Sequence, residues 1–244
     1  MLNPLIAKLE QLTRLSAEDR QLLETLTSEP VRRCEPGTDI VREGDDPHSV
    51  RLILSGWAYR YKQLPDGRRQ VVALLLPGDL CDHDGWVLSE MDHSIGALSV
   101  VTLAEIPPAA FEATMSAHSR VAQVLRWDAL VNTAMQREWM LNLGRRSATE
   151  RLAHLFCEVF YRLRPIGLLQ GNTCEMPLTQ TDLADVIGMT PVHVNRVLQV
   201  LRRQGLIELR GCRLTIPDLA GLELAALFNP NYLHLGHVGA RFDT

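Results

Sequence analysis

The chain has 244 residues, of which 46% are hydrophobic and 22% charged, and it carries a formal net charge of −4. That length accommodates two domains with separate cores, and the composition is ordinary for a soluble globular protein. No stretch approaches the roughly 18 apolar residues of a membrane span, and the N-terminus lacks the basic and apolar regions of a signal peptide, so we expect a cytoplasmic protein without a membrane partner.

Residues 1–28 are expected to form two short helices, the second opened by the capping pair Ser16 and Asp19. From residue 29 to residue 117 the pattern changes. Turn-forming pairs such as Asp66–Gly67 recur between short strand-like runs, and residues 57–62 alternate aromatic and polar side chains. Regular short strands of this kind predict a closed antiparallel barrel or sandwich over residues 29–117.

Residues 118–144 lack proline and have their first glycine at the end, which predicts one helix of about 25 residues. The helix has two apolar faces, and both must be covered. We assign one face to the barrel and the other to a second copy of the chain; the alternative is a helix buried inside a monomer. The face assigned to the dimer consists of Val121, Leu125, Met135 and Trp139. Residues 142–146 are interpreted as a hinge.

Residues 145–228 are expected to form a second domain. Ser147 opens a helix that runs to about Arg164, and a loop then leads to two short helices. The first of these begins at Thr179 and ends at Gly188, and the second covers residues 191–204. Its buried stripe consists of Val194, Val197, Leu198 and Leu201.

A strand pair at residues 206–209 and 213–216 and a helix from Asp218 to about Phe228 complete this domain. The tail at residues 229–244 shows no clear pattern. Two short helices followed by such a hairpin predict a winged helix-turn-helix that binds double-stranded DNA; the alternative is an ordinary helical hairpin. The face of the second helix opposite its apolar stripe consists of Val192, Asn195, Arg196, Gln199 and Arg203.

Those side chains suit a DNA major groove, because arginine pairs with guanine edges, Asn and Gln pair with adenine, and an aliphatic group can contact a thymine methyl. The charge distribution agrees. Residues 145–216 carry 10 Lys+Arg against 6 Asp+Glu, a balance of +4, and all ten basic residues are arginine. Residues 1–144 carry 14 against 20, a balance of −6. The positive charge that DNA phosphates require is therefore on the helix-turn-helix half.

The order of barrel, long helix, hinge and winged helix-turn-helix resembles that of the cyclic-AMP receptor protein and fumarate-nitrate regulator (Crp/Fnr) family. The most specific segments are LTQTDLADVIGMTPVHVNRVLQVLRRQGLI and Pro77–Gly78–Asp79–Leu80. The resemblance implies an α+β fold with a double-stranded β-helix (jelly-roll) sensor barrel, a dimerisation helix and a winged helix-turn-helix. It also implies a homodimer on a palindromic DNA site, with RNA polymerase as a further partner.

The resemblance implies that Arg196 aligns with the arginine that reads a base in other members of the family. Val192 stands where relatives usually carry a glutamate, so we expect a different operator sequence. Thr179, Gln180 and His193 are placed for contact with phosphates, which position a protein without specifying sequence.

The sensory site departs from the nucleotide-binding relatives. They carry a Gly-Glu pair and then an Arg-Ser pair, whereas the candidate pocket residues here are Cys81, Asp82, His83, His93 and Ser94. Because aspartates surround this stretch and it contains no arginine, a cyclic phosphate would meet repulsion, and cyclic AMP is not expected. Residues 1–33 contain no cysteine, so an iron–sulfur cluster is not expected either.

The Cys81-x-His83 spacing resembles that of a haem-binding member of the family. The alternatives are another metal bound by His83, His93 and a carboxylate, some other small ligand, or histidines that serve structure or respond to pH. The five cysteines (Cys34, Cys81, Cys157, Cys174 and Cys212) include no C-x-x-C pair, which argues against disulfides and a structural zinc site.

Two other functional classes were weighed. A regulatory subunit for a partner protein would explain the barrel but not the helix-turn-helix or the arginine bias. An enzyme is not expected, because the chain contains no G-x-S-x-G, no phosphate-binding glycine loop and no H-E-x-x-H.

Overall fold

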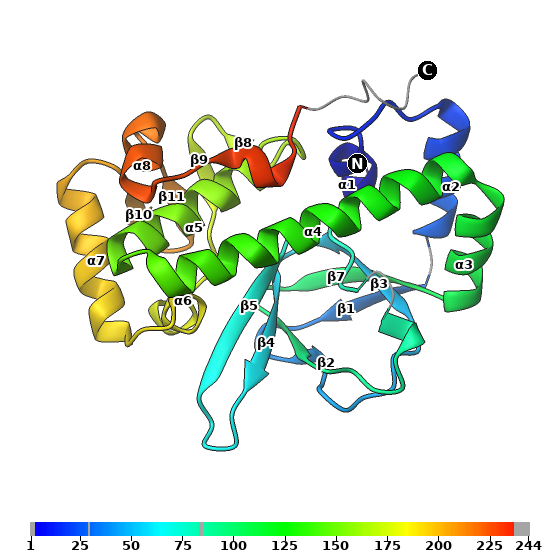
Figure 1. Ribbon diagram of the computed structural model, residues 1–244, viewed down its shortest axis with the longest axis horizontal. Helices are drawn as coiled ribbons and strands as arrows, with labels where there is room; N and C mark the ends of the chain where they lie inside the picture. Colours follow the sequence, from blue (N-terminus) through cyan, green and yellow to red (C-terminus); the bar gives the residue numbers. More distant parts are fainter. Residues whose placement is uncertain (1–2, 29, 83–84, 237–244) are drawn as a thin grey trace. The chain divides into compact units, whose positions relative to one another are not determined.

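The computed structural model describes residues 3–28, 30–82 and 85–236 (Figure 1). It divides into two compact units. One comprises the described residues up to Lys62 together with Ala73–Thr133, and the other comprises Gln63–Val72 and Ala134–Leu233. None of the described helices combines the length and the apolar character that crossing a membrane requires.

The first unit contains two antiparallel sheets, which confirm the expected barrel class. One has the strand order β1-β7-β3 and the other the order β2-β6-β4-β5. The strands are β1 (Val31–Cys34), β2 (Asp39–Val41), β3 (Val50–Ser55), β4 (Ala58–Gln63), β5 (Arg69–Leu75), β6 (Ser94–Ala97) and β7 (Val101–Ile106), with a 3-10 turn η1 at Gly85–Val87. Side chains such as Ile53, Ile95 and Leu103 fill the core between strands. The Asp66–Gly67 turn joins β4 to β5, as predicted, and Gly67 has a φ of +90°.

Helices α1 (Pro4–Leu9) and α2 (Ala17–Leu26) precede the strands. The Lys8 ammonium on α1 lies 2.9 Å from Asp79 Oδ1 and 2.7 Å from Asp128 Oδ1. At Gly78 a Cβ would lie 2.6 Å from the Pro4 carbonyl oxygen, so only glycine allows this approach. The Pro77–Leu80 segment thus serves as the docking point of α1.

After β7, helix α3 (Pro108–Ala117) leads into α4 (Ser119–Arg145). Helix α3 was not distinguished from the barrel in the sequence. The long helix was predicted, but residues 142–145 are helical rather than a break. The chain turns only at Ser147, which caps the next helix by the expected pairing with Glu150.

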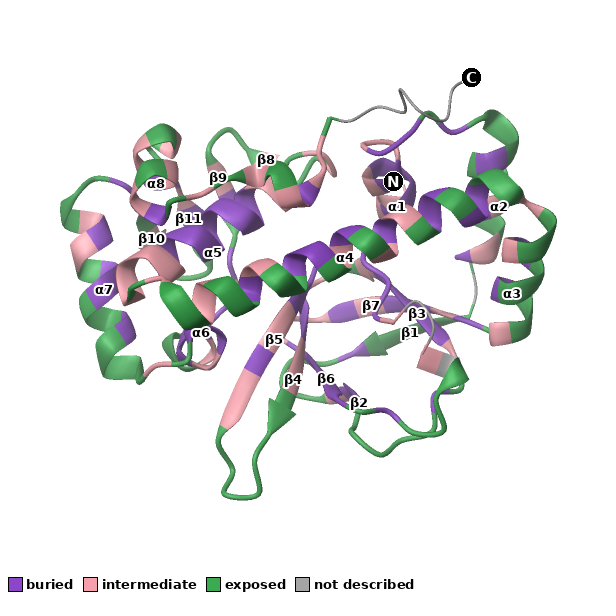
Figure 2. Cartoon of the chain, viewed as in Figure 1, coloured by how far each residue is buried: buried purple, intermediate pink, exposed green. Residues whose placement is uncertain are grey.

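The assignment of Val121, Leu125, Met135 and Trp139 to a dimer face was wrong, because all four are buried within their own chain. Figure 2 shows buried and exposed positions mixed along α4. Val121 and Leu125 belong to the same apolar cluster as side chains of α1, an element whose contacts the sequence did not predict. The solvent-exposed apolar side chains of α4 are Leu130, Met140 and Leu141, with 68%, 66% and 47% of their surface exposed.

The second unit contains α5 (Ala148–Leu163), α6 (Gln180–Ile187), α7 (Pro191–Arg203), α8 (Leu219–Ala226) and a 3-10 turn η2 (Pro230–Leu233). Its four-stranded sheet has the order β10-β11-β9-β8. The strands are β8 (Leu169–Gln170), β9 (Thr173–Glu175), β10 (Glu208–Arg210) and β11 (Arg213–Thr215). The β10–β11 hairpin was predicted, but the β8–β9 hairpin lies in a stretch that was expected to be a loop.

A buried carboxylate, Glu158 on α5, joins three parts of this unit. It accepts hydrogen bonds from Trp139 Nε1 on α4 at 3.1 Å and from the Tyr232 hydroxyl of η2 at 2.8 Å, and Arg162 lies 3.4 Å away. Burial raises the pKa of Glu158, while Arg162 and the two hydrogen bonds oppose that shift. We call Glu158, Trp139, Arg162 and Tyr232 the Glu158 network. Through it, part of the segment after residue 229, in which the sequence showed no pattern, joins the core.

Candidate nucleic-acid interface and sensory site

The candidate nucleic-acid interface is built on α6 and α7. At the start of α6, the Thr179 hydroxyl accepts from Asp182 N at 3.1 Å, and Asp182 Oδ2 accepts from Thr179 N at 2.9 Å. Gly188, with a φ of +67°, ends α6 in the left-handed region. Thr190 then caps α7, and Pro191 occupies its first turn.

Helix α7 presents the two faces that the sequence predicts. Its buried side chains are Val194, Val197, Leu198 and Leu201. The exposed side chains are Val192, His193, Asn195, Arg196, Gln199 and Arg203. Thr179 and Gln180 at the start of α6 are also exposed, and Gln180 Oε1 accepts from Asn195 Nδ2 at 3.3 Å. All eight residues expected to contact DNA are therefore accessible within this unit, and their contacts with DNA remain a prediction.

Arginines surround this surface, but several also have structural partners. Arg202 donates to the Leu209 carbonyl at 2.7 Å, which ties α7 to β10, and Arg213 donates to Gln170 Oε1 at 3.0 Å. Arg151 on α5 donates to the Ile187 carbonyl at 3.0 Å, just before the turn between α6 and α7. Arg196 lies on the exposed face of α7.

The candidate sensory site lies in the first unit. His93 Nδ1 is 2.6 Å from Asp92 Oδ1, and its Nε2 is 3.3 Å from Asp82 Oδ1. The hydrogen bond with His93 lowers the pKa of Asp92. The Ser94 hydroxyl accepts from Glu43 N at 2.9 Å. His83, the remaining candidate besides Cys81, lies outside the described residues.

The structure corrects one step of the electrostatic reasoning, because an arginine does reach this site. Arg60 on β4 donates to the Cys81 carbonyl and lies 3.3 Å from Asp82 Oδ1. Arg60 belongs to the polar side of the alternating run at residues 57–62, yet only 16% of its side chain is exposed. Side chains on one face of a strand recur at every second residue whether that face is buried or exposed. The alternation therefore could not show that Arg60 is buried.

The residues of the site do not fit a cyclic nucleotide or a thiolate-bound metal well. Arg60 is already paired with Asp82, and an anionic ligand would have to displace that carboxylate and approach Asp92. The Cys81 thiol is buried, and burial raises its pKa, which disfavours the thiolate that metals bind. Among the described residues, no three His, Cys, Asp or Glu side chains are grouped so as to hold a metal ion.

Two family models match the chain in the expected order. Residues 31–118 match a cyclic nucleotide-binding domain, and residues 150–225 match a Crp-like helix-turn-helix domain. The match to the first model covers the strands and α3, and it does not by itself identify a ligand.

Curated relatives cover most of the chain. The transcriptional activator protein FnrL of Cereibacter sphaeroides is 31% identical over 213 residues, which is 86% of this chain and 84% of that protein. The nitrogen fixation regulation protein FixK of Bradyrhizobium diazoefficiens is 31% identical over 192 residues, covering 78% of this chain and 79% of that protein.

Among solved structures, FixK2 from Bradyrhizobium japonicum matches with a TM-score of 0.72 and 24% identity, over 80% of this chain and 96% of that one. This similarity confirms the fold class: a barrel of the cyclic-nucleotide-binding type, a long helix and a helix-turn-helix.

Proposed function

Since the chain belongs to the Crp/Fnr family of transcription regulators, we propose that it is a homodimeric regulator that binds a palindromic DNA sequence. The observation that carries this proposal is the exposed face of α7, where polar and arginine side chains stand opposite a fully buried apolar stripe. A helix that only packs within a hairpin does not require base-reading side chains such as Asn, Arg and Gln to be grouped on one exposed face. We place this activity in the cytoplasm, where DNA and reduced thiols coexist.

Each exposed side chain of the interface has a proposed role. Arg196 pairs with a guanine edge, and Asn195 and Gln199 read adjacent bases. Val192 contacts a thymine methyl. The remaining residues, Thr179, Gln180, His193 and Arg203, contact phosphates and set the register of α7 in the major groove.

We propose that the dimer forms along the exposed apolar side chains of α4, namely Leu130, Met140 and Leu141. Large apolar side chains exposed along one helix are costly unless another surface covers them. A two-fold dimer of this kind presents two copies of α7 about one DNA turn, or about 34 Å, apart, which explains a palindromic operator. RNA polymerase is the further partner that a regulator of transcription acts on.

The barrel is proposed to sense a signal other than cyclic AMP. This rests on Asp82 and Asp92 around His93, and on an arginine that is already neutralised. Haem, another metal and a small uncharged or cationic ligand remain alternatives, and an absorption spectrum with metal analysis of the purified protein separates them.

The test of the proposed function starts from selection of bound duplexes out of a random pool. Arg196→Ala is expected to weaken binding to the selected palindrome by at least about 5- to 150-fold, because each bidentate base contact contributes about 1–3 kcal/mol and the dimer loses one in each half-site. Arg33→Ala removes the same charge from an exposed position on β1, away from α4 and α7 in sequence, and serves as the control. If the wild-type protein selects no common sequence, or both variants bind like wild type, the proposal is wrong.

A further inference from the structure

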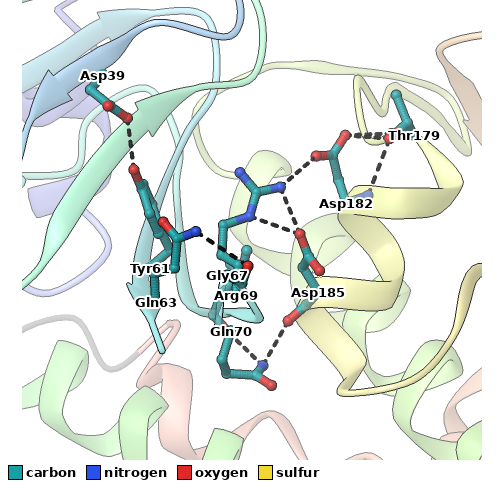
Figure 3. Close-up of polar contacts among 10 residues, drawn as sticks. Asp39, Tyr61, Gln63, Gly67, Arg69, Gln70, Thr179, Asp182 and Asp185 are labelled. Carbon is teal, nitrogen blue, oxygen red and sulfur yellow. Dashed lines mark hydrogen bonds and ion pairs between the residues drawn. The ribbon is translucent and has the colours of Figure 1, made fainter. Parts of the chain in front are cut away.

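The far end of the β4–β5 hairpin, Gln63–Val72, belongs to the same compact unit as the helix-turn-helix. Arg69 at its second strand meets two carboxylates of α6 (Figure 3). Arg69 Nε donates to Asp185 Oδ2 at 2.8 Å, and Arg69 Nη2 lies 2.6 Å from the same oxygen. The same Nη2 lies 3.5 Å from Asp182 Oδ1. Between 18% and 26% of each of these side chains is exposed, so the cluster is partly accessible to solvent.

The neighbouring Gln70 holds the other end of α6. Its side-chain amide donates to the Asp185 carbonyl at 2.8 Å and to the Val186 carbonyl at 3.0 Å. Carbonyl groups in the last turn of a helix have no partner within the helix. Side chains from outside α6 therefore donate hydrogen bonds to these carbonyls. Gln70 donates to two of them, and Arg151 donates to the carbonyl of Ile187. The hairpin supports α6 at both ends of one face.

The charge of this cluster matters because of where α6 begins. Asp182 Oδ2 lies 2.6 Å from the Thr179 hydroxyl, so its carboxylate is adjacent to the residues proposed to contact phosphates. A carboxylate close to a DNA backbone repels it, and a paired guanidinium cancels that repulsion.

We infer that Arg69 is a positioning residue for DNA binding: it holds α6 through Asp182 and Asp185 and offsets part of their negative charge beside the phosphate-contacting end of the helix. This inference rests on the proposed DNA-binding function. The new element is a residue of the β4–β5 hairpin, which lies outside the matched helix-turn-helix at residues 150–225.

The experiment measures the affinity of the full chain for its selected duplex by fluorescence anisotropy at several salt concentrations. Arg69→Ala is expected to weaken binding by about fivefold at 0.1 M salt, and by less at high salt, because the Debye length falls from about 10 Å at 0.1 M to about 3 Å at 1 M. Arg68→Ala is the matched control. It removes the same charge from the adjacent residue, which pairs with Asp66 inside the hairpin turn at 2.8 Å and does not bond to α6. We expect its affinity to stay within about twofold of wild type.

A second variant separates charge cancellation from a purely structural role and does not depend on the folding of Arg69→Ala. Asp185→Asn keeps a hydrogen-bonding side chain and removes one negative charge, so it is expected to strengthen binding about twofold, and to restore part of the affinity lost in Arg69→Ala. The inference is overturned if Arg69→Ala binds like Arg68→Ala, if it binds more tightly than wild type, or if Asp185→Asn weakens binding as Arg69→Ala does. Should the wild-type chain select no duplex at all, the proposed function falls together with this inference; specific wild-type binding with equal Arg68 and Arg69 variants refutes the inference alone.

Discussion

Replacing Tyr232 by phenylalanine tests whether the Glu158 network holds the second unit together. The change removes one hydroxyl and leaves the ring, which stacks on His154 with centroids 5.9 Å apart and meets Phe228 at 6.0 Å. No cavity forms, so the effect reports the hydrogen bond to Glu158 alone.

The magnitude follows from the burial of the acceptor. Glu158 is fully buried and keeps its bonds to Trp139 and Arg162, so it loses one of three partners. A buried hydrogen bond to a charged group contributes about 1.5–3 kcal/mol, and we expect Tyr232→Phe to lower the free energy of unfolding of the second unit by about 2 kcal/mol. For a domain of this size that corresponds to a decrease in melting temperature of about 8 °C.

Calorimetry of the full chain measures this decrease, with Asn231→Ala as the control because the Asn231 side chain is exposed beside it. Burial already raises the pKa of Glu158, and losing the Tyr232 donor raises it further. The cost of the substitution should therefore shrink as the pH falls and the carboxyl takes up a proton. A decrease of less than about 0.5 kcal/mol, or one equal to that of the control, would refute this account of the network.

Three further results are expected. Burial, with help from Arg146, lowers the pKa of His154 to about 3. The unfolded chain then binds a proton that the folded chain does not, so the contribution of His154 to stability is greatest above about pH 6.5 and declines below it by up to about 1.4 kcal/mol per pH unit. Urea unfolding at pH 7 and pH 5 checks this, and an unchanged slope in His154→Gln would contradict it. Leu130→Asp is expected to convert a dimer into a monomer in analytical ultracentrifugation. If Leu130 were instead buried inside a monomer, the same substitution would unfold the chain. Titration calorimetry with cyclic AMP should show no micromolar binding, and tight binding would mean that Asp82 and Asp92 do not repel the phosphate.

Local sequence rules anticipated much of the second unit. Ser147 with Glu150, and Thr179 with Asp182, form the capping boxes that their spacing predicts. The buried stripe of α7 follows from helical periodicity, since the apolar side chains recur every three or four residues. Such features depend on neighbours within one turn of helix, and a single sequence contains all of that information.

Features that depend on distant partners were missed. Val121 has the same apolar character whether it faces α1 or a second copy, so composition could not decide between them. Strand β8 has two residues, too few for any periodicity to appear, and it exists because β9 pairs with β11. Arg60 and Tyr232 are each held by a carboxylate far away in sequence, Asp82 and Glu158.

The path of the chain has a practical consequence for dissecting this protein. A fragment that starts at Ala134 contains every element of the winged motif but lacks Gln70, so two carbonyls at the end of α6 would be left to water. A chimera that exchanges sensor barrels between relatives would lose the same bonds, unless its Gln63–Val72 segment came from the same protein as its C-terminal half. A substitution of Asp182 or Asp185 would likewise remove an ionic partner of Arg69, which lies more than a hundred positions earlier in the chain.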